Sequence, residues 1–154
     1  MSRPIKDTVD YFPHDCKHRK TMFIIEQKYG NDGYAFWFKM LESLGETKGH
    51  FIDCNNDAEW EFLQSKTRQN NGFCAEILNL LAKLAAIDKD LWTKHRVIWC
   101  QNFVDRVAEV YNKRQRDIPQ KPVLDNDNPS VSDVSVPETM SKQPKLGDKT
   151  DKVN

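Results

Sequence analysis

The chain has 154 residues, with 23 basic and 23 acidic side chains, so its formal net charge is zero. This balance excludes the class of proteins that bind nucleic acid through a large net positive charge alone. All aromatic residues (8 Phe, 4 Tyr and 4 Trp) lie between Tyr11 and Tyr111, whereas most prolines lie at or after Pro119. We therefore expect an extended arm over residues 1–10, one folded domain over residues 11–117 and a disordered polar tail over residues 118–154.

The expected location follows from two absent signals and from the cysteines. No stretch approaches the roughly 18 apolar residues that span a bilayer, and the first residues, MSRPIKDTVDYF, lack the apolar core of a secretory signal. We expect a cytoplasmic protein without membrane contact. The cysteines are widely spaced without a CxxC pair, so we expect free thiols in a reducing compartment; they are Cys16, Cys54, Cys74 and Cys100.

The first half of the domain has the pattern of two helices separated by a glycine. The first helix is expected over residues 15–29 and ends at Gly30, because glycine tolerates the left-handed backbone that follows many helices. The second is expected over residues 33–46. Its YAFWFKML segment is apolar nearly all round, which indicates a central, buried helix.

The second half mixes helices with short strands. Residues 50–53 form a strand candidate, and helices are expected over residues 58–66 and 73–86 because their apolar residues recur at helical spacing. Residues 87–100 place aromatic and β-branched runs (Leu91-Trp92 and 97–100) around a polar turn, which is typical of a β-hairpin. A last helix is expected over residues 102–116.

The order of these elements predicts the fold class. The two middle helices, joined by a short turn, form a helix-turn-helix candidate. The hairpin would follow them as a wing, with its tip at Lys94-His95-Arg96, and the strand at 50–53 would complete a three-stranded sheet. The expected fold is mainly α with a small antiparallel β-hairpin wing, that is, a winged helix-turn-helix.

Three segments resemble a known family. They are YFPHD (residues 11–15), KTMFIIEQKYGNDGYAFWFKMLE (20–42) and WCQNFVDRVAEVYNKR (99–114). They resemble the N-terminal domain of phage replisome organisers, which is similar to the winged-helix domain of the DnaD-like primosome proteins. The resemblance implies a winged-helix fold and a role in starting phage or prophage DNA replication, through origin binding or assembly of the helicase loader.

A winged helix would bind duplex DNA through its second middle helix and its wing. Basic side chains there would contact phosphates, and amide side chains at the helix start would reach base edges. The candidate DNA-binding residues are Lys66, Arg68, Gln69, Asn70, Asn71, Asn79, Lys83, Lys94, His95 and Arg96.

Catalytic and metal chemistry have little support in the sequence. GxSxG, Walker, GxGxxG and HExxH motifs are absent, and the alternation of His14, Cys16 and His18 departs from zinc-ligand spacing. We expect neither an enzyme nor a metal or cofactor site. Trp37 and Trp99 are assigned to the core, whereas Trp60 and Trp92 are candidates for an exposed partner surface.

Two alternatives to duplex binding stay open at this point. In the first, the domain is a protein–protein module that joins copies of itself or recruits a helicase loader, a use of wings that the resemblance also implies. In the second, it is a phage transcription regulator. Double-stranded DNA, a replication protein and a second copy of the chain are therefore the three candidate partners.

Overall fold

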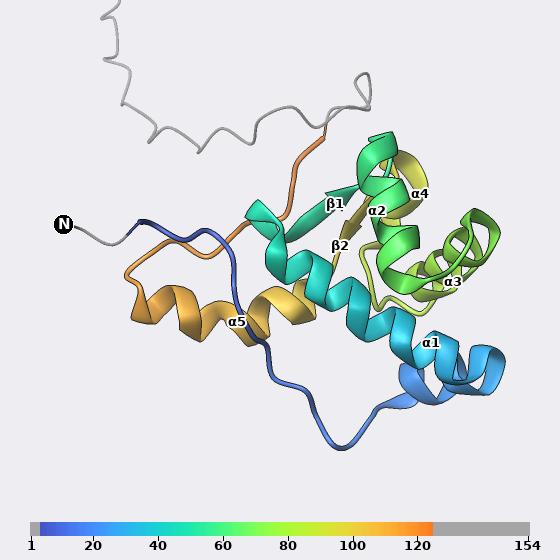
Figure 1. Cartoon of the computed structure of the whole chain (residues 1–154). Coiled ribbons are helices and arrows are strands. Elements are labelled where there is room, and N and C mark those ends of the chain that lie inside the picture. Colours follow the sequence, from blue (N-terminus) through green and yellow to red (C-terminus); the bar gives the residue numbers. More distant parts are fainter. Residues whose placement is uncertain (1–3, 125–154) are drawn as a thin grey trace, which may run out of the picture.

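The computed structural model describes residues 4–124, and Figure 1 shows their arrangement. The elements are α1 (Lys20–Glu46), a 3-10 turn (Lys48–His50), β1 (Phe51–Asp53), α2 (Asp57–Thr67), α3 (Asn71–Lys83), α4 (Lys89–His95), β2 (Val97–Trp99) and α5 (Gln101–Lys113). The predicted class is confirmed: the fold is mainly helical with a small antiparallel sheet, consistent with a winged-helix-like fold. Most of the predicted tail, residues 125–154, lies outside the described residues.

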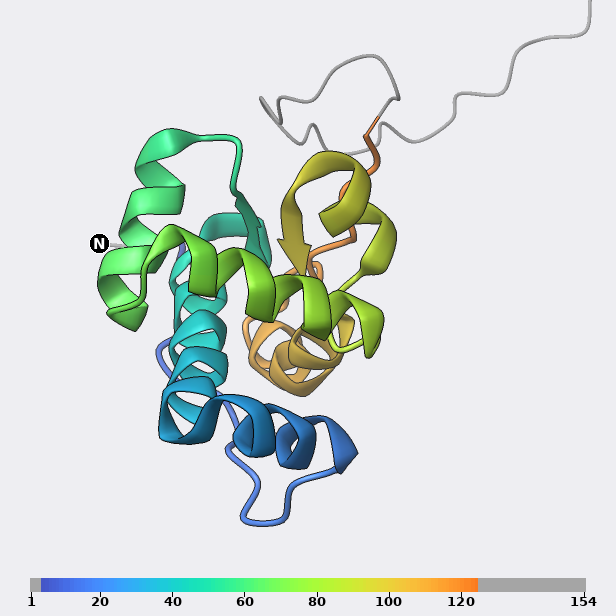
Figure 2. The ribbon, with the colours of Figure 1, turned by 90° about the vertical axis from the view of Figure 1, so that its right-hand side faces the viewer.

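Helix α1 is broken at the glycine that the sequence marked. Gly30 has φ 62° and ψ −146°, a backbone conformation that side-chain-bearing residues rarely adopt. Beyond the break, Phe36, Met40 and Leu44 are fully buried, so the second half of α1 is the central helix that its composition predicted. Figure 2 shows the first half turning away from this central segment.

The two halves of α1 meet closely at Gly33. A Cβ atom at this position would lie 2.7 Å from Tyr29 Cβ and 3.0 Å from the Ile25 carbonyl oxygen. Gly33 is buried, and Ile25 is fully buried with it. The bend in α1 therefore depends on two glycines. Gly30 adopts a backbone conformation that other residues rarely adopt, and Gly33 leaves room for the close approach of Tyr29 and Ile25.

The sheet consists of β1 and β2, which pair antiparallel with Ile52 opposite Ile98. The β-hairpin predicted over residues 87–100 is wrong in its first strand and turn, because Lys89–His95 form the helix α4. Asp88 caps this helix, since its side chain accepts a hydrogen bond from the Leu91 N–H at 2.9 Å. Lys94, His95 and Arg96 consequently lie at the C-terminal end of α4 instead of at a hairpin tip, and residues 4–124 contain two paired strands instead of three.

Other helix bounds differ from the expected ones by a few residues, with one larger shift at the start. The helix expected from residue 15 begins at Lys20, and the preceding residues are extended. The helix expected over residues 73–86 spans Asn71–Lys83, because Asn70 provides its cap. The two-residue shift at the start of α3 is of the size by which helix ends commonly vary, whereas the five-residue shift at the start of α1 is larger.

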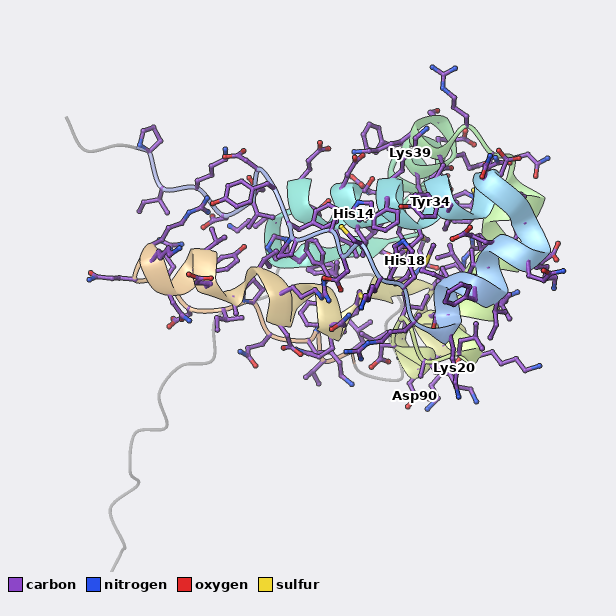
Figure 3. All side chains as sticks on the ribbon, turned by 90° about the horizontal axis from the view of Figure 1, so that it is seen from below. His14, His18, Lys20, Tyr34, Lys39 and Asp90 are labelled. Carbon is purple, nitrogen blue, oxygen red and sulfur yellow. The ribbon has the colours of Figure 1, made fainter. Side chains whose placement is uncertain are left out.

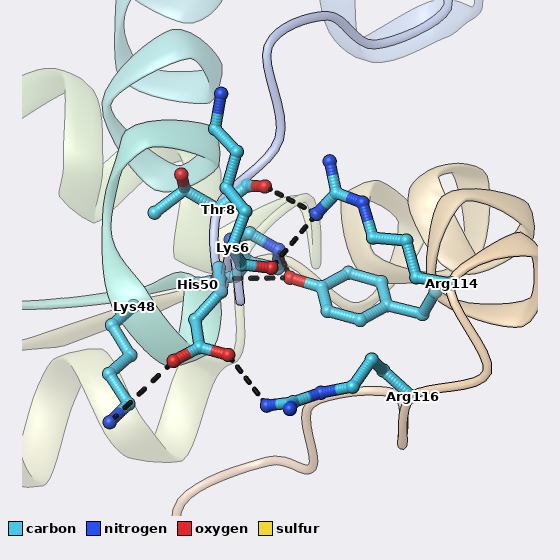
Figure 4. A network of polar contacts seen from close by, with 8 residues as sticks. Lys6, Thr8, Lys48, His50, Arg114 and Arg116 are labelled. Carbon is cyan, nitrogen blue, oxygen red and sulfur yellow. Dashed lines mark hydrogen bonds and ion pairs between the residues drawn. The ribbon is translucent and has the colours of Figure 1, made fainter. Parts of the chain in front are cut away.

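The N-terminal arm (residues 4–19) lies across α5 and the end of α1. Arg114 donates hydrogen bonds to the Lys6 and Thr8 carbonyl oxygens at 3.0 and 2.8 Å, and Arg116 forms an ion pair with Asp7 at 2.8 Å (Figure 4). The Val9 N–H donates to the Gly45 carbonyl oxygen at 3.0 Å. The arm is therefore held by groups from both ends of the domain.

Further along, the arm crosses α1 through stacked rings. The His14 ring lies parallel to Phe38 with centroids 3.9 Å apart, and His14 Nε2 pairs with the Tyr34 hydroxyl at 2.9 Å. Figure 3 shows His14, His18 and Tyr34 together at this crossing. Arg106 of α5 pairs with Asp15 beside it. These contacts hold residues 14 and 15 of the arm against α1 and α5.

A fully buried histidine joins the arm to the core. His50 Nδ1 donates to the Leu44 carbonyl oxygen at 2.7 Å, and its Nε2 contacts the Tyr111 hydroxyl. The Tyr111 hydroxyl also lies 3.2 Å from the Asp7 carbonyl oxygen. Burial lowers the pKa of the His50 imidazole below its ordinary value of 6.5, although the backbone groups of Leu44 and Thr47 act in the opposite direction.

The lowered pKa of His50 predicts acid sensitivity of the fold. The unfolded chain binds a proton at this site more readily than the folded chain, so stability decreases as the pH falls below about 6.5 towards the folded pKa, by at most about 1.4 kcal/mol per pH unit. We expect His50→Gln to flatten this part of the profile in urea unfolding between about pH 7.5 and 5.5. The same replacement at the exposed His14 is the control, and an unchanged slope in His50→Gln would contradict the prediction.

Residues 118–124 of the predicted tail lie against the domain. Lys121 forms an ion pair with Asp88 at 2.9 Å, and Ile118 and Leu124 pack against the core. Pro122 is buried. Across residues 4–124, none of the helices combines the length and the apolar character needed to cross a membrane.

Candidate nucleic-acid interface

The N-terminal end of α3 is open to solvent. The Asn70 side chain accepts a hydrogen bond from the Phe73 N–H at 2.8 Å and so begins the helix. Asn70, Asn71 and Gly72 are all exposed. The unpaired N–H groups and the dipole at such an end favour anions, phosphate among them.

Arg96 lies over two buried tryptophans whose indole N–H groups bind α3. Its guanidinium carbon is 4.9 Å from the centre of the Trp60 ring and 5.8 Å from that of Trp92, and the two rings are 6.5 Å apart. Arg96 itself is exposed. A guanidinium held on aromatic faces is fixed in direction and keeps its N–H donors for a planar acceptor such as phosphate.

The same tryptophans orient two asparagines of α3. Trp60 Nε1 donates to Asn71 Oδ1 at 2.9 Å, and Trp92 Nε1 donates to Asn79 Oδ1 at 2.7 Å. Because an indole N–H can only donate, each amide presents its oxygen to the ring and keeps its NH₂ group as a donor. Both asparagines are exposed, so their NH₂ groups are available to acceptors on phosphates or base edges.

Lys66 points away from this surface. Its ammonium lies 3.6 Å from a Glu42 oxygen and 3.4 Å from a Glu46 oxygen, both on α1, and its side chain is only 17% exposed. Its neighbour Arg68 is exposed and caps α2 with a left-handed backbone at φ 56°. The structure therefore separates the two members of this predicted basic cluster.

The remaining candidate DNA-binding residues differ in exposure and in their distance along the chain from the start of α3. Lys94 is exposed and pairs with Asp90 one turn earlier at 3.5 Å. His95 and Gln69 are half-buried, and the His95 carbonyl oxygen accepts a hydrogen bond from Asn55. Lys83 is exposed at the C-terminal end of α3, away from Asn70. Asn70, Asn71, Asn79 and Arg96 are thus the predicted residues that the structure brings together.

The acidic residue on α3 is neutralised from α1. Glu76 forms an ion pair with Lys28 at 3.4 Å and accepts a hydrogen bond from the Tyr29 hydroxyl at 3.1 Å. Burial, together with Glu76, raises the pKa of Tyr29 to about 12. Lys28 and the Tyr29 hydroxyl therefore offset part of the repulsion that the Glu76 carboxylate would exert on a phosphate near α3.

Three of the four thiols lie in the core. Burial raises the pKa of Cys54 to about 12, and it also raises the pKa values of Cys74 and Cys100. A thiol with a raised pKa is protonated at neutral pH and is a poor nucleophile. Cys16 is exposed in the arm, and no cluster of three metal-ligating side chains occurs in the described part of the chain.

Sequence reasoning missed the role of the tryptophans. Trp60 and Trp92 were expected as an exposed partner surface, but they are only 8% and 4% exposed. Their rings instead lie under the Arg96 guanidinium. The assignment of Trp99 to the core is confirmed at 1% exposure. An indole and its asparagine acceptor lie 11 or 13 residues apart in different helices, so no local pattern reveals the pairing.

The family model described as "Lin1244/Lin1753-like, N-terminal" matches residues 11–103. The matched range begins in the arm and ends in the first turn of α5, so it includes Trp60, Trp92 and Arg96. No curated protein and no solved structure matches the chain.

Proposed function

The chain belongs to the Lin1244/Lin1753-like N-terminal family, which is phage-associated, and we propose that it is a non-catalytic DNA-replication accessory that binds duplex DNA. Two observations support this proposal. The fold is consistent with a winged helix, an architecture that presents a helix to the major groove. The resemblance to phage replisome organisers suggests replication as the process.

One observation carries the proposed binding mode. Arg96 is fixed on Trp60 and Trp92, and the same two tryptophans bind Asn71 at the exposed start of α3 and Asn79 two turns later, which leaves both asparagine NH₂ groups free to donate. In the proposed complex, α3 lies against the major groove with its N-terminal end towards the backbone. Arg96 and the helix start contact phosphates, and the asparagines lie next to base edges.

Arg96→Gln tests this binding mode. Glutamine keeps part of the stem on the tryptophans and the same left-handed backbone position, but it removes the charge. We expect binding to a random duplex to weaken roughly 3- to 10-fold at low salt, and the slope of log K against log salt to fall by about one. Fluorescence anisotropy with a labelled duplex across a salt series measures both quantities.

Lys113→Ala is the matched control, because Lys113 is an exposed cation on α5 whose ion-pair partner among residues 4–124 is Glu109 of its own helix. It should leave the affinity and the salt slope as in the unmodified protein. Arg96→Lys should keep most of the slope while losing some affinity, since lysine keeps the charge but not the planar donor set. An Arg96→Gln slope equal to that of the unmodified protein would refute the assigned contact.

Replication and transcription predict different specificity. A replication accessory that contacts mostly backbone should bind random and origin-derived duplexes with similar affinity, whereas a repressor should prefer one operator by a factor of about 10³ or more. We propose a helicase loader as the protein partner. Co-purification of the loader encoded by the same phage or prophage tests that partner separately from DNA binding.

A further inference from the structure

The first half of α1 carries an exposed apolar and basic face. Lys20, Phe23, Ile24 and Gln27 are spaced i, i+3, i+4 and i+7, so they share one side of the helix, and all four are exposed. Phe23 is 67% and Ile24 40% exposed. Exposed large apolar groups side by side on one helix face are typical of a protein-binding surface. We call these four residues the α1 face.

Helix α2 carries a second face with the same spacing and the opposite charge. Ala58, Glu61, Phe62 and Ser65 are likewise spaced i, i+3, i+4 and i+7, and all four are exposed. Phe62 is 53% exposed. We call these residues the α2 face.

The two faces match each other in shape and charge. Each has an exposed phenylalanine with a smaller apolar residue beside it on the same side of the helix, and each carries one charged residue of opposite sign, Lys20 on the α1 face and Glu61 on the α2 face. Neither Lys20 nor Glu61 has an ion-pair partner among residues 4–124, and the next acidic side chain, Glu59, is also exposed. Two helices with such faces can pair through their apolar centres while the charges fix the orientation.

Within one molecule the two faces do not meet. Figures 1 and 2 place the first half of α1 and α2 at opposite ends of the folded domain. The acidic side chains of α1 that reach α2, Glu42 and Glu46, come from its second half and bind Lys66 instead. A contact between the two faces therefore requires a second copy of the chain.

We propose that copies of this protein bind head to tail, with the α1 face of one copy on the α2 face of the next. Phe23 and Ile24 pack against Phe62, and Lys20 pairs with Glu61. Because the two paired faces differ, two bound copies still have one free α1 face and one free α2 face between them. Further copies can bind to these free faces, so the contact produces chains or closed rings instead of a simple dimer. The proposal is independent of the proposed DNA binding, because the protein alone forms the contact.

The size of the faces predicts a weak contact. Two helix faces of about two turns bury less than roughly 800 Å² together, which is below the size of stable interfaces. We expect association in the range of roughly 0.1–1 mM, weakened by salt because it includes an exposed ion pair. On a duplex, neighbouring copies would meet at a far higher local concentration, so the same contact would make binding cooperative.

Charge exchange between the faces tests the proposal. Sedimentation velocity of the free protein in reducing buffer, up to about 1 mM and at low salt, should give a weight-average coefficient that rises with concentration. Lys20→Glu and Glu61→Lys should each abolish the rise. An equimolar mixture of the two variants should restore it, because each then meets an opposite charge on the other, and the double variant should restore it as well.

Controls distinguish this contact from general charge effects. Lys113→Glu reverses a charge on α5 and should leave the rise unchanged, whereas Phe23→Ser should reduce it without changing the net charge. A monomeric protein at every concentration would overturn the proposal. So would a mixture of Lys20→Glu and Glu61→Lys that stays as monomeric as either variant alone. Neither result would affect the proposed duplex binding, which is measured at low protein concentration with Arg96→Gln.

Discussion

Replacing Phe36 with alanine is expected to lower the free energy of unfolding by about 3–5 kcal/mol. Phe36 is fully buried in the second half of α1, and its ring lies 6.1 Å from that of Phe73 on α3. The change removes apolar area from the centre of the domain and leaves a cavity between helices that cannot all move inward. Urea unfolding followed by tryptophan fluorescence measures the loss.

Phe23→Ala is the matched control for this prediction. It makes the same chemical change in the same helix, so the gain in helix propensity is equal in the two variants. Phe23 is 67% exposed, and its truncation should change stability by no more than about 0.5 kcal/mol. Equal effects at the two positions would show that the second half of α1 is not the centre of the core.

Gly33→Ala should destabilise the fold by about 2–3 kcal/mol, although alanine is the better helix former. The added Cβ would lie 2.7 Å from Tyr29 Cβ and 3.0 Å from the Ile25 carbonyl oxygen. The Ile25 carbonyl oxygen is a backbone atom, and Tyr29 Cβ is bonded directly to the backbone. Neither atom can move away from the added Cβ without displacing the first half of α1. Thermal or urea unfolding of the variant gives the difference.

Gly72→Ala is the corresponding glycine control. In the first turn of α3 the nearest atom to an added Cβ is Asn70 Oδ1 at 3.5 Å, which is ordinary contact. Removing backbone freedom from the unfolded chain there should stabilise the protein by roughly 0.5–1 kcal/mol. If both glycine variants were equally stable, the close approach inside α1 would not constrain the fold.

The helical part of the fold was predictable because its signals are local. Gly30 marked the break in α1, and the all-round apolar YAFWFKML segment marked the central helix. The error fell on residues 91–96, where aromatic and β-branched composition suggested a strand. The Asp88 cap and the packing of Trp92 against α3 instead favour a helix, and strand propensity is weak enough to yield to such contacts.

The candidate interface was predictable only in part. Arg96, expected at the tip of a hairpin, instead ends the helix α4 and lies over the ring of Trp60. Its support by Trp60 depends on a contact across 36 positions of the chain, which periodicity cannot reveal. Lys66 shows the opposite case, because a basic residue in a promising local cluster is held by two glutamates of another helix.

The arm that Arg114 and Arg116 hold has a consequence for the order of events during synthesis. The contacts of Arg114, Arg116 and Tyr111 with the arm span 104 to 109 positions of the chain. The residues of the arm are therefore synthesised well before the residues of α5 that bind them. Such long closures slow folding, so a nascent chain halted before α5 should have the end of α1 uncovered and His50 without Tyr111.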